Sequence, residues 1–170
     1  GWKELPILGT LHVGHFFEPF SLERLTSNRF TTFMERGLPD QPFVPARNFG
    51  IASYHVAENE HATWTAGIFR TNSDVFGDDV GDNGERSFTT RATWLPYYDE
   101  PSGGRYYAHL GAGYSFRDAD GDVVQFRSQP EARLGTVLFN NVPFFVDTGF
   151  IPAHYWQLLG LEAAWIAGPF

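Results

Sequence analysis

Several common features are missing from this sequence of 170 residues, and each absence narrows the possible folds and functions. Cysteine does not occur, which excludes a fold held by disulfides, and the single lysine is Lys3. No stretch approaches the roughly 18 uncharged apolar residues of a transmembrane helix, so any crossing of a bilayer is made by strands. Lysine and arginine form no cluster, and with a formal net charge of -8 this argues against a nucleic-acid partner.

Aromatic residues and glycine are abundant instead. Phenylalanine, tyrosine and tryptophan together make up 17% of the chain, and 17 of these rings are phenylalanine. Aromatic rings favour strands and also collect at the two interfaces of a membrane. The 18 glycines and 11 prolines supply many turns without a long polar tract of low complexity. The composition therefore predicts a β-rich chain.

Apolar and polar residues alternate in segments about as long as a membrane-spanning strand, most clearly over residues 105–117. An aromatic ring lies near each end of the apolar face, with smaller residues between, as is typical of a strand that crosses two lipid interfaces. This face consists of Tyr106, Ala108, Leu110, Ala112, Tyr114 and Phe116. Residues 61–70 and 87–97 repeat the pattern.

These segments predict an all-β fold, an antiparallel transmembrane β-barrel that is present here as a partial barrel of about eight strands. Connections between the strands alternate in length, as in outer-membrane barrels, although the acidic turn at 118–122 is brief where a long loop is due. The longest connection is residues 19–46, in which Ser21 is expected near the cap of a helical turn. The remaining strands are expected at 7–18, 47–58, 122–130, 143–150 and 154–167.

A soluble β-sandwich or small barrel that binds a ligand is the first alternative, because the same alternation packs an interior core. Four rings discriminate between the folds, since they form an outward belt in a membrane barrel and are buried against a second sheet in a sandwich. They are Trp64, Trp94, Tyr106 and Tyr114. A structural barrel or surface adhesin without conductance is the second alternative.

Short sequence blocks follow one another from residue 13 to the end of the chain. They read VGHFFEPFSLE at 13–23, FMER at 33–36, PARNFG at 45–50, SQPEA at 128–132, VDTG at 146–149, GLEAA at 160–164 and GPF at 168–170. In this order they resemble the phosphate-selective porin O/P family. The resemblance implies a barrel of roughly sixteen strands in the bacterial cell outer membrane. It also implies a homotrimer in outer-membrane lipid, small anions such as phosphate as solutes, and a loop folded inward to narrow each pore.

Both ends of the sequence read as cut, so we expect residues 1–170 to be a fragment of a single porin β-barrel domain. Residues 19–46 are the expected constriction element. About half of a barrel has two unpaired strand edges, which hydrocarbon does not tolerate, so we do not expect this part to conduct by itself.

Arginines on polar strand faces are the candidate pore-lining residues. Arg91 and Arg105 lie on such faces, where an arginine either attracts anions or forms an ion pair. By the resemblance, Arg127 belongs to a ladder of lumen-facing arginines, with Arg133 beyond it. The positions two residues to either side of Arg127 are neutral glutamines, which weakens the match to that ladder.

Three further arginines, Arg29, Arg36 and Arg47, flank the long connection. They are candidates to line a constriction in which Glu23 and Glu35 oppose them, and the alternative is a solvated loop held by ion pairs. The sequence therefore predicts an outer-membrane diffusion channel for small hydrophilic solutes that prefers anions such as phosphate.

No residue pattern predicts an enzyme, a cofactor or a metal site. Ser115 and His109 share a strand face, but six residues of strand separate them by roughly 20 Å. His12 and His15 fall on opposite faces of a strand, which is poor geometry for a metal. Acidic loop residues offer oxygen ligands for Ca²⁺, but their spacing does not match the calcium-binding loop, so turns or exposed acidic loops are the simpler reading. These residues are Asp74, Asp78, Asp79, Asp82, Glu85, Asp118, Asp120 and Asp122.

Overall fold

The computed structural model is dominated by β-strands, which confirms the all-β prediction. It describes residues 2–5, 8–31, 33, 35–71, 85–130 and 143–168. Its elements in chain order are β1 (Trp2–Leu5), β2 (Gly9–Phe17), α1 (Leu22–Leu25), α2 (Asp40–Phe43), β3 (Arg47–Val56), β4 (Ala62–Arg70), β5 (Arg86–Tyr98), η1 (Glu100–Ser102), β6 (Tyr106–Asp118), η2 (Asp120–Asp122), β7 (Val123–Val124), β8 (Arg127–Ser128), β9 (Val146–Asp147), β10 (Ile151–Pro152) and β11 (Tyr155–Ala167).

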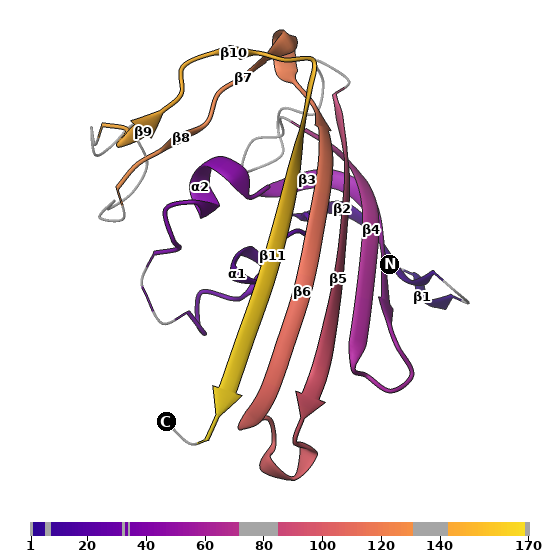
Figure 1. Ribbon diagram of the computed structural model, residues 1–170. Helices are drawn as coiled ribbons and strands as arrows, with labels where there is room; N and C mark the ends of the chain where they lie inside the picture. Colours follow the sequence, from indigo (N-terminus) through magenta and orange to yellow (C-terminus); the bar gives the residue numbers. More distant parts are fainter. Residues whose placement is uncertain are drawn as a thin grey trace.

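Seven strands form one sheet in the order β1-β2-β3-β4-β5-β6-β11, and each pair is antiparallel. Strands that are adjacent in this sheet are also consecutive along the chain, apart from the short strands between β6 and β11. The sheet curves into a trough and stays open, with β1 and β11 at its edges (Figure 1). The structure therefore shows an antiparallel barrel wall that is not closed.

The outer face of this wall is a continuous apolar surface. The strand register places Trp64, Ala92 and Ala112 in one row, and Leu161 completes it. Side chains of this parity point away from the rest of the chain, and Leu161 and Trp165 are 80% and 81% exposed. The exposed large side chains of this face include Trp64, Ile68, Phe88, Trp94, Tyr106, Leu110, Phe116, Leu159, Leu161 and Trp165.

The four discriminating rings belong to this outer face. Trp64, Trp94 and Tyr106 are exposed, and Tyr114 is half-buried and donates a 2.9 Å hydrogen bond from its hydroxyl to Gln157. They form an outward belt and are not sealed against a second sheet. The sandwich alternative is therefore wrong, because its core requires these rings inside.

The inner face of the wall is made of small and polar residues. Thr89 and Ser115 are completely buried there, and their hydroxyl oxygens lie 2.8 Å apart. A small apolar core lies at the β2–β4 side of the same face, where Phe69 and Ala52 are 1% exposed and the Phe16 ring lies 5.4 Å from that of Phe69. The two faces thus follow from the two-residue period of a strand.

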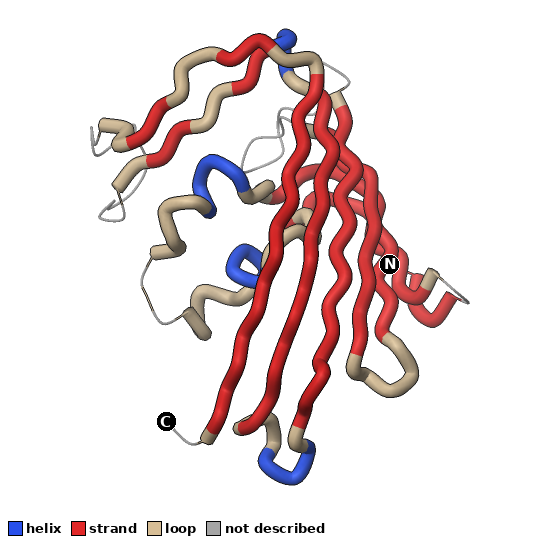
Figure 2. The backbone as a smooth tube through the Cα atoms, viewed as in Figure 1, coloured by secondary structure: helices blue, strands red, loops and turns tan. Residues whose placement is uncertain are grey.

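Connections differ in length between the two ends of the sheet, as Figure 2 shows. Short turns at 57–61 and 99–105 join strands at one end, and the long connections 18–46, 71–85 and 119–154 leave the other. The predicted alternation of short and long connections is confirmed. The acidic turn at 118–122 is no exception, because it is only the beginning of the connection 119–154.

The prediction that residues 122–130 and 143–150 form strands of the wall is wrong. Only two-residue strands form there: β7 and β8 in the first segment and β9 in the second, with β7 paired to β10 and β8 to β9 in small ribbons. Gly121, with a left-handed φ of 56°, and Pro152, which has no N–H to donate, lie at one end of the β7–β10 ribbon and limit its backbone hydrogen bonds there. The wall therefore has fewer long strands than the alternation indicates.

Residues 18–46, called the inner segment below, lie on the trough side of the sheet (Figure 1). Its base is closed by a hydrogen bond of 3.2 Å from the Glu18 amide to the Ala46 carbonyl. Ser21 caps α1, as predicted, by accepting a hydrogen bond of 3.2 Å from the Arg24 amide. Among the described residues, no helix has the length and apolar character needed to cross a membrane.

Candidate functional site

A buried ion pair fixes the start of the inner segment to the wall. Glu18 is completely buried, and Arg117 donates to it across 2.8 Å. Asn48 and Thr89 donate hydrogen bonds of 2.5 and 2.6 Å to the two carboxylate oxygens, and Ser87 lies within 3.3 Å. These partners belong to β3, β5 and β6, so the Glu18 carboxylate binds to three strands of the wall. A buried charge is tolerated here because both its counter-ion and its hydrogen bonds are supplied.

A second carboxylate joins the wall to the beginning of α1. Glu162 of β11 accepts a hydrogen bond of 2.7 Å from the Leu22 amide. Its other oxygen lies 3.1 Å from His109 Nε2 and forms an ion pair with Arg91. Arg91 therefore lies on the inner face, as the alternation predicts, and Glu162 balances its charge.

Phe20 packs into a place on the wall that glycine leaves empty. A Cβ atom at Gly113 would lie 2.2 Å from the Phe20 carbonyl oxygen, so only glycine allows this approach. A Cβ at Gly160 would lie 3.2 Å from the tip of the Phe20 ring. The two glycines of β6 and β11 thus form the seat on which the segment rests.

Arginines also hold the inner segment to itself. Arg24 forms an ion pair of 2.8 Å with Asp40 and donates to the Asp40 carbonyl, so it links α1 to α2. Arg36 donates to the carbonyls of Glu23 and Thr26, at 3.0 and 3.1 Å. These donations satisfy carbonyls that lack partners in so short a helical segment.

Burial raises the pKa of the Asp40 carboxyl above its usual range, and the attraction of Arg24 only partly offsets this. The cause is visible in the geometry. Asp40 Oδ2 faces Arg24, whereas Oδ1 is buried without a hydrogen-bond partner in the described part of the chain.

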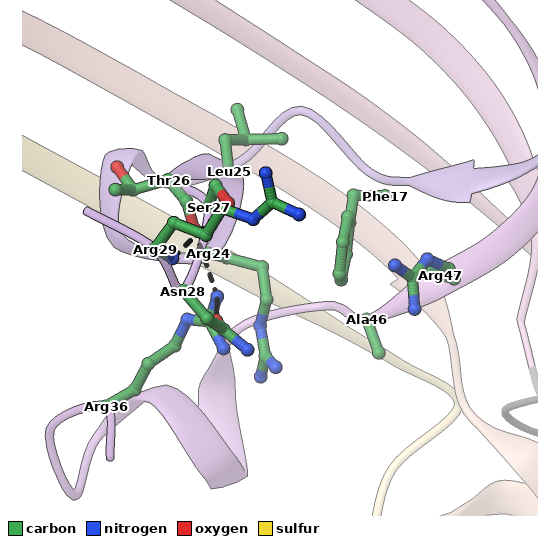
Figure 3. A pocket seen from close by; sticks show the side chains of 10 residues that line it. All are labelled: Phe17, Arg24, Leu25, Thr26, Ser27, Asn28, Arg29, Arg36, Ala46 and Arg47. Carbon is green, nitrogen blue, oxygen red and sulfur yellow. Dashed lines mark hydrogen bonds between the residues drawn. The ribbon is translucent and has the colours of Figure 1, made fainter. Parts of the chain in front are cut away.

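Four arginines line a hollow of about 730 Å³ beside the inner segment. Figure 3 shows residues 24–29 and Arg36 on one side of it and Phe17, Ala46 and Arg47 on the other. The Arg47 guanidinium lies 4.1 Å from the centre of the Phe17 ring, a cation–π contact. The structure brings together three of the predicted residues, Arg29, Arg36 and Arg47, and adds Arg24.

The other predicted arginines lie elsewhere. Arg105 is exposed beside the short turn that precedes β6, at the end of the sheet opposite the long connections. Arg127 lies on the two-residue strand β8, and its guanidinium is 4.6 Å from the centre of the Phe144 ring. The predicted ladder strand around Arg127 is thus not formed, since Gln129 two residues on is buried after the strand has ended. Arg133 lies outside the described residues.

The acidic residues singled out in the sequence are separated in the structure. Asp118 accepts a hydrogen bond of 3.2 Å from the Arg86 amide, and Asp122 lies 2.6 Å from His154. Glu85 accepts a hydrogen bond of 3.4 Å from the Thr71 hydroxyl, and the other acidic candidates of that loop, at 74–82, lie outside the described residues. His12 and His15 occupy opposite faces of β2, with rings near Tyr54 and Phe49 respectively. The described residues contain no group of three side chains placed to hold a metal.

Sequence reasoning missed Glu18, Arg117 and Glu162 as residues that position the inner segment. A signal was present, because the polar face of 105–117 includes Arg117, and a charge on that face requires a partner. Glu18 and Glu162 both belong to blocks that carry the family resemblance. The sequence did not indicate which arginine pairs with either glutamate, because the partners of the two ion pairs lie 71 and 99 positions apart in the chain.

An apolar outer face, a polar inner face and a long connection folded onto the inner face define the wall of a membrane β-barrel. The chain belongs to the phosphate-selective porin O and P family, whose model matches residues 2–170. This is a channel family of the bacterial outer membrane, and trimers are typical of it, so the protein is an outer-membrane porin. No curated protein matches the sequence.

Proposed function

We propose that this porin is a passive diffusion channel for small hydrophilic solutes and that it favours anions, phosphate among them. The observation that carries the proposal is the hollow lined by Arg24, Arg29, Arg36 and Arg47. Arginine stays charged at physiological pH, and its planar guanidinium matches the oxygens of phosphate. A small anion that passes the inner segment meets these groups.

The distribution of charge supports the hollow as the place where the channel favours anions. On the wall, Arg91 and Arg117 are each paired with a glutamate. In the hollow, Arg24 is likewise paired with Asp40, whereas Arg36 donates to neutral carbonyls and forms no ion pair with a described carboxylate. The Arg29 side chain makes no hydrogen bond or ion pair with another described residue.

The acidic character of the chain is compatible with a local preference for anions. The formal net charge is -8. Exposed carboxylates in loops far from the hollow act over a screening length of about 8 to 10 Å at physiological salt. The field in a narrow passage is therefore set by the nearest charges, among them Arg29 and Arg36, which form no ion pair with a described carboxylate.

The proposal includes the assembly of the pore. The open sheet becomes part of a closed barrel, because unpaired edges are costly in hydrocarbon, and the inner segment narrows its lumen as the constriction element. Three such barrels form the homotrimer that is typical of the family. Chemical cross-linking of the protein in outer membranes tests this, with a band at three times the monomer mass as the expected result.

The decisive experiment measures ion selectivity in planar bilayers, with the protein expressed from its entire reading frame. Arg29→Glu is expected to lower the anion-to-cation permeability ratio about tenfold. This follows because two units of charge about 10 Å from a monovalent ion are worth roughly 0.8 kcal/mol at a dielectric constant near 80, and the effects on the anion and the cation have opposite sign and add in the ratio. The matched control is Arg105→Glu, which makes the same charge change at the opposite end of the wall.

Reversal potentials measured in chloride gradients and in phosphate gradients give the permeability ratio of each variant. An unchanged reversal potential for Arg29→Glu, or an equal shift for both variants, would remove the hollow from the conduction path. The absence of any current from the wild-type protein would end the channel proposal and favour a purely structural barrel.

A further inference from the structure

We propose that Glu162 is a positioning residue that holds the inner segment against the wall and thereby keeps the width of the pore constant. The inference rests on the proposed function, since it assigns a residue to the constriction of that pore. Glu162 itself is not part of the arginine-lined hollow.

The first support is the geometry at the beginning of α1. The Leu22 amide points to Glu162 Oε2 at 2.7 Å, and the Arg24 amide is taken by Ser21. The contact joins residues 140 positions apart in the chain. It is a hydrogen bond to a charged acceptor, which is stronger than one between neutral groups.

The second support is that the wall holds the Glu162 carboxylate in one orientation. Arg91 of β5 and His109 of β6 both contact Oε1, which leaves Oε2 directed at the inner segment. The carboxylate lies across Gly111, where a Cβ atom would come within 2.3 Å of Oε1. Residues of three neighbouring strands thus hold the Glu162 carboxylate in place as the acceptor for the Leu22 amide.

The third support is the place of this contact along the segment. Glu18 fixes the base of the segment, and Ser128 Oγ donates to the Leu38 carbonyl at 3.1 Å further along. Between these two points Glu162 supplies a described hydrogen bond from the wall, and it reaches the first residue of α1. Glu162 therefore fixes the position of α1, which also carries Arg24 of the hollow.

Two variants separate the anchor from the charge. Glu162→Asp keeps the charge that balances Arg91, but its side chain is one carbon shorter and no longer reaches the Leu22 amide. Glu162→Gln combined with Arg91→Met removes both charges but keeps the length of residue 162, so the glutamine oxygen accepts from the Leu22 amide while its N–H₂ group faces His109 Nε2 and no guanidinium donor.

Single-channel recording of the protein from its entire reading frame is the first test. With Glu162→Asp we expect a noisier and larger open-channel current at an unchanged reversal potential. With Glu162→Gln combined with Arg91→Met we expect a steady current and a reversal potential like those of the wild type, because the contact with Leu22 is kept and the net charge is unchanged. A steady current for Glu162→Asp, or equal noise for both variants, would overturn the proposal.

A second measurement keeps the test independent of conduction. Because the chain has no cysteine, Leu22→Cys provides a single thiol whose backbone amide still reaches residue 162. In whole cells, labelling by a charged thiol reagent is expected to be about fivefold faster with Glu162→Asp than with Glu162→Gln combined with Arg91→Met, since only the second variant keeps the hydrogen bond from the residue 22 amide. Equal labelling rates would overturn the proposal even if no variant conducts, whereas a silent wild-type channel would overturn only the proposed function.

Discussion

The wall and the inner segment of this porin are stabilised in different ways. In the wall, the six longest strands have nine to thirteen residues, and backbone hydrogen bonds pair them along most of their length. In the inner segment, the helices α1 and α2 have four residues each, so their backbones satisfy few of their own polar groups. Side chains must supply the rest, and the charged ones among them are Glu23, Arg24, Arg36 and Glu162.

Arginine therefore has a different role in each of the two regions. Arg117 in the wall is buried against a glutamate, and its charge is cancelled. Arg36 in the segment donates to backbone carbonyls and keeps its positive charge beside the hollow. The comparison teaches that the number of arginines does not predict anion preference, because the partner of each arginine decides whether its charge is available.

The largest effect is expected where the two regions meet at the buried ion pair. Glu18→Ala leaves the Arg117 guanidinium buried without its counter-ion, and we expect the free energy of unfolding to fall by about 3 to 5 kcal/mol. Urea unfolding in lipid vesicles, followed by tryptophan fluorescence, measures this. Glu18→Gln combined with Arg117→Met removes both charges and is expected to recover most of the loss. A double variant as unstable as Glu18→Ala would show that packing, and not the unpaired charge, is responsible.

A smaller effect is expected at the glycine seat of Phe20. Gly113→Ala places a Cβ where the Phe20 carbonyl lies, 2.2 Å away, and overpacking of this kind costs about 1 to 3 kcal/mol. Gly160→Ala is the matched control, because its Cβ would meet only the ring tip at 3.2 Å, which can yield. The same urea experiment distinguishes them. Equal midpoints for both variants would mean that the segment does not rest on the wall at Phe20.

The smallest effect is expected in the ribbon formed by β8 and β9, which belongs to neither region. Hydrogen bonds from the Gly149 amide and the Gln125 side chain, at 2.8 and 2.7 Å, lower the pKa of Asp147 below its ordinary value of 3.8. The folded state therefore favours the ionised carboxylate. Its contribution is fully present above pH 3.8 and is lost as the pH falls through the lowered pKa.

A fluorophore on Phe150→Cys reports this transition, and we expect the ribbon to stay ordered down to pH 4 and to loosen below it. In Asp147→Asn the pH dependence in this range should disappear, because the amide does not titrate there. A transition of the same size in both proteins would assign the effect to another group.

The wall was predictable because its information is local. Over residues 105–117 the alternation correctly assigned the aromatic face to the outside and Arg117 to the inside. A strand requires only that every second residue suits the same environment, and this is visible in a single segment. The aromatic rings near both ends of that segment indicated the correct fold class for the same reason.

The connection 119–154 shows where such reasoning fails. Its apolar and polar residues also alternate at 122–130, but the chain turns at Gly121 and the strands end after two residues. Short alternating stretches do not distinguish a strand of the wall from a ribbon in a loop, since both present two faces. Arg127 was therefore expected in a pore ladder and lies instead over the Phe144 ring.

The sequence by itself determined that the chain forms antiparallel strands with one face for lipid and one for water, because a two-residue period is a local property. It also determined that residues 19–46 form one long connection between two strands. Only the tertiary structure decided which arginines are neutralised, since Glu18 and Glu162 find Arg117 and Arg91 across 71 to 99 residues of chain. Such pairs depend on the register of several strands and on how the inner segment packs against them, and no single stretch of sequence contains that information.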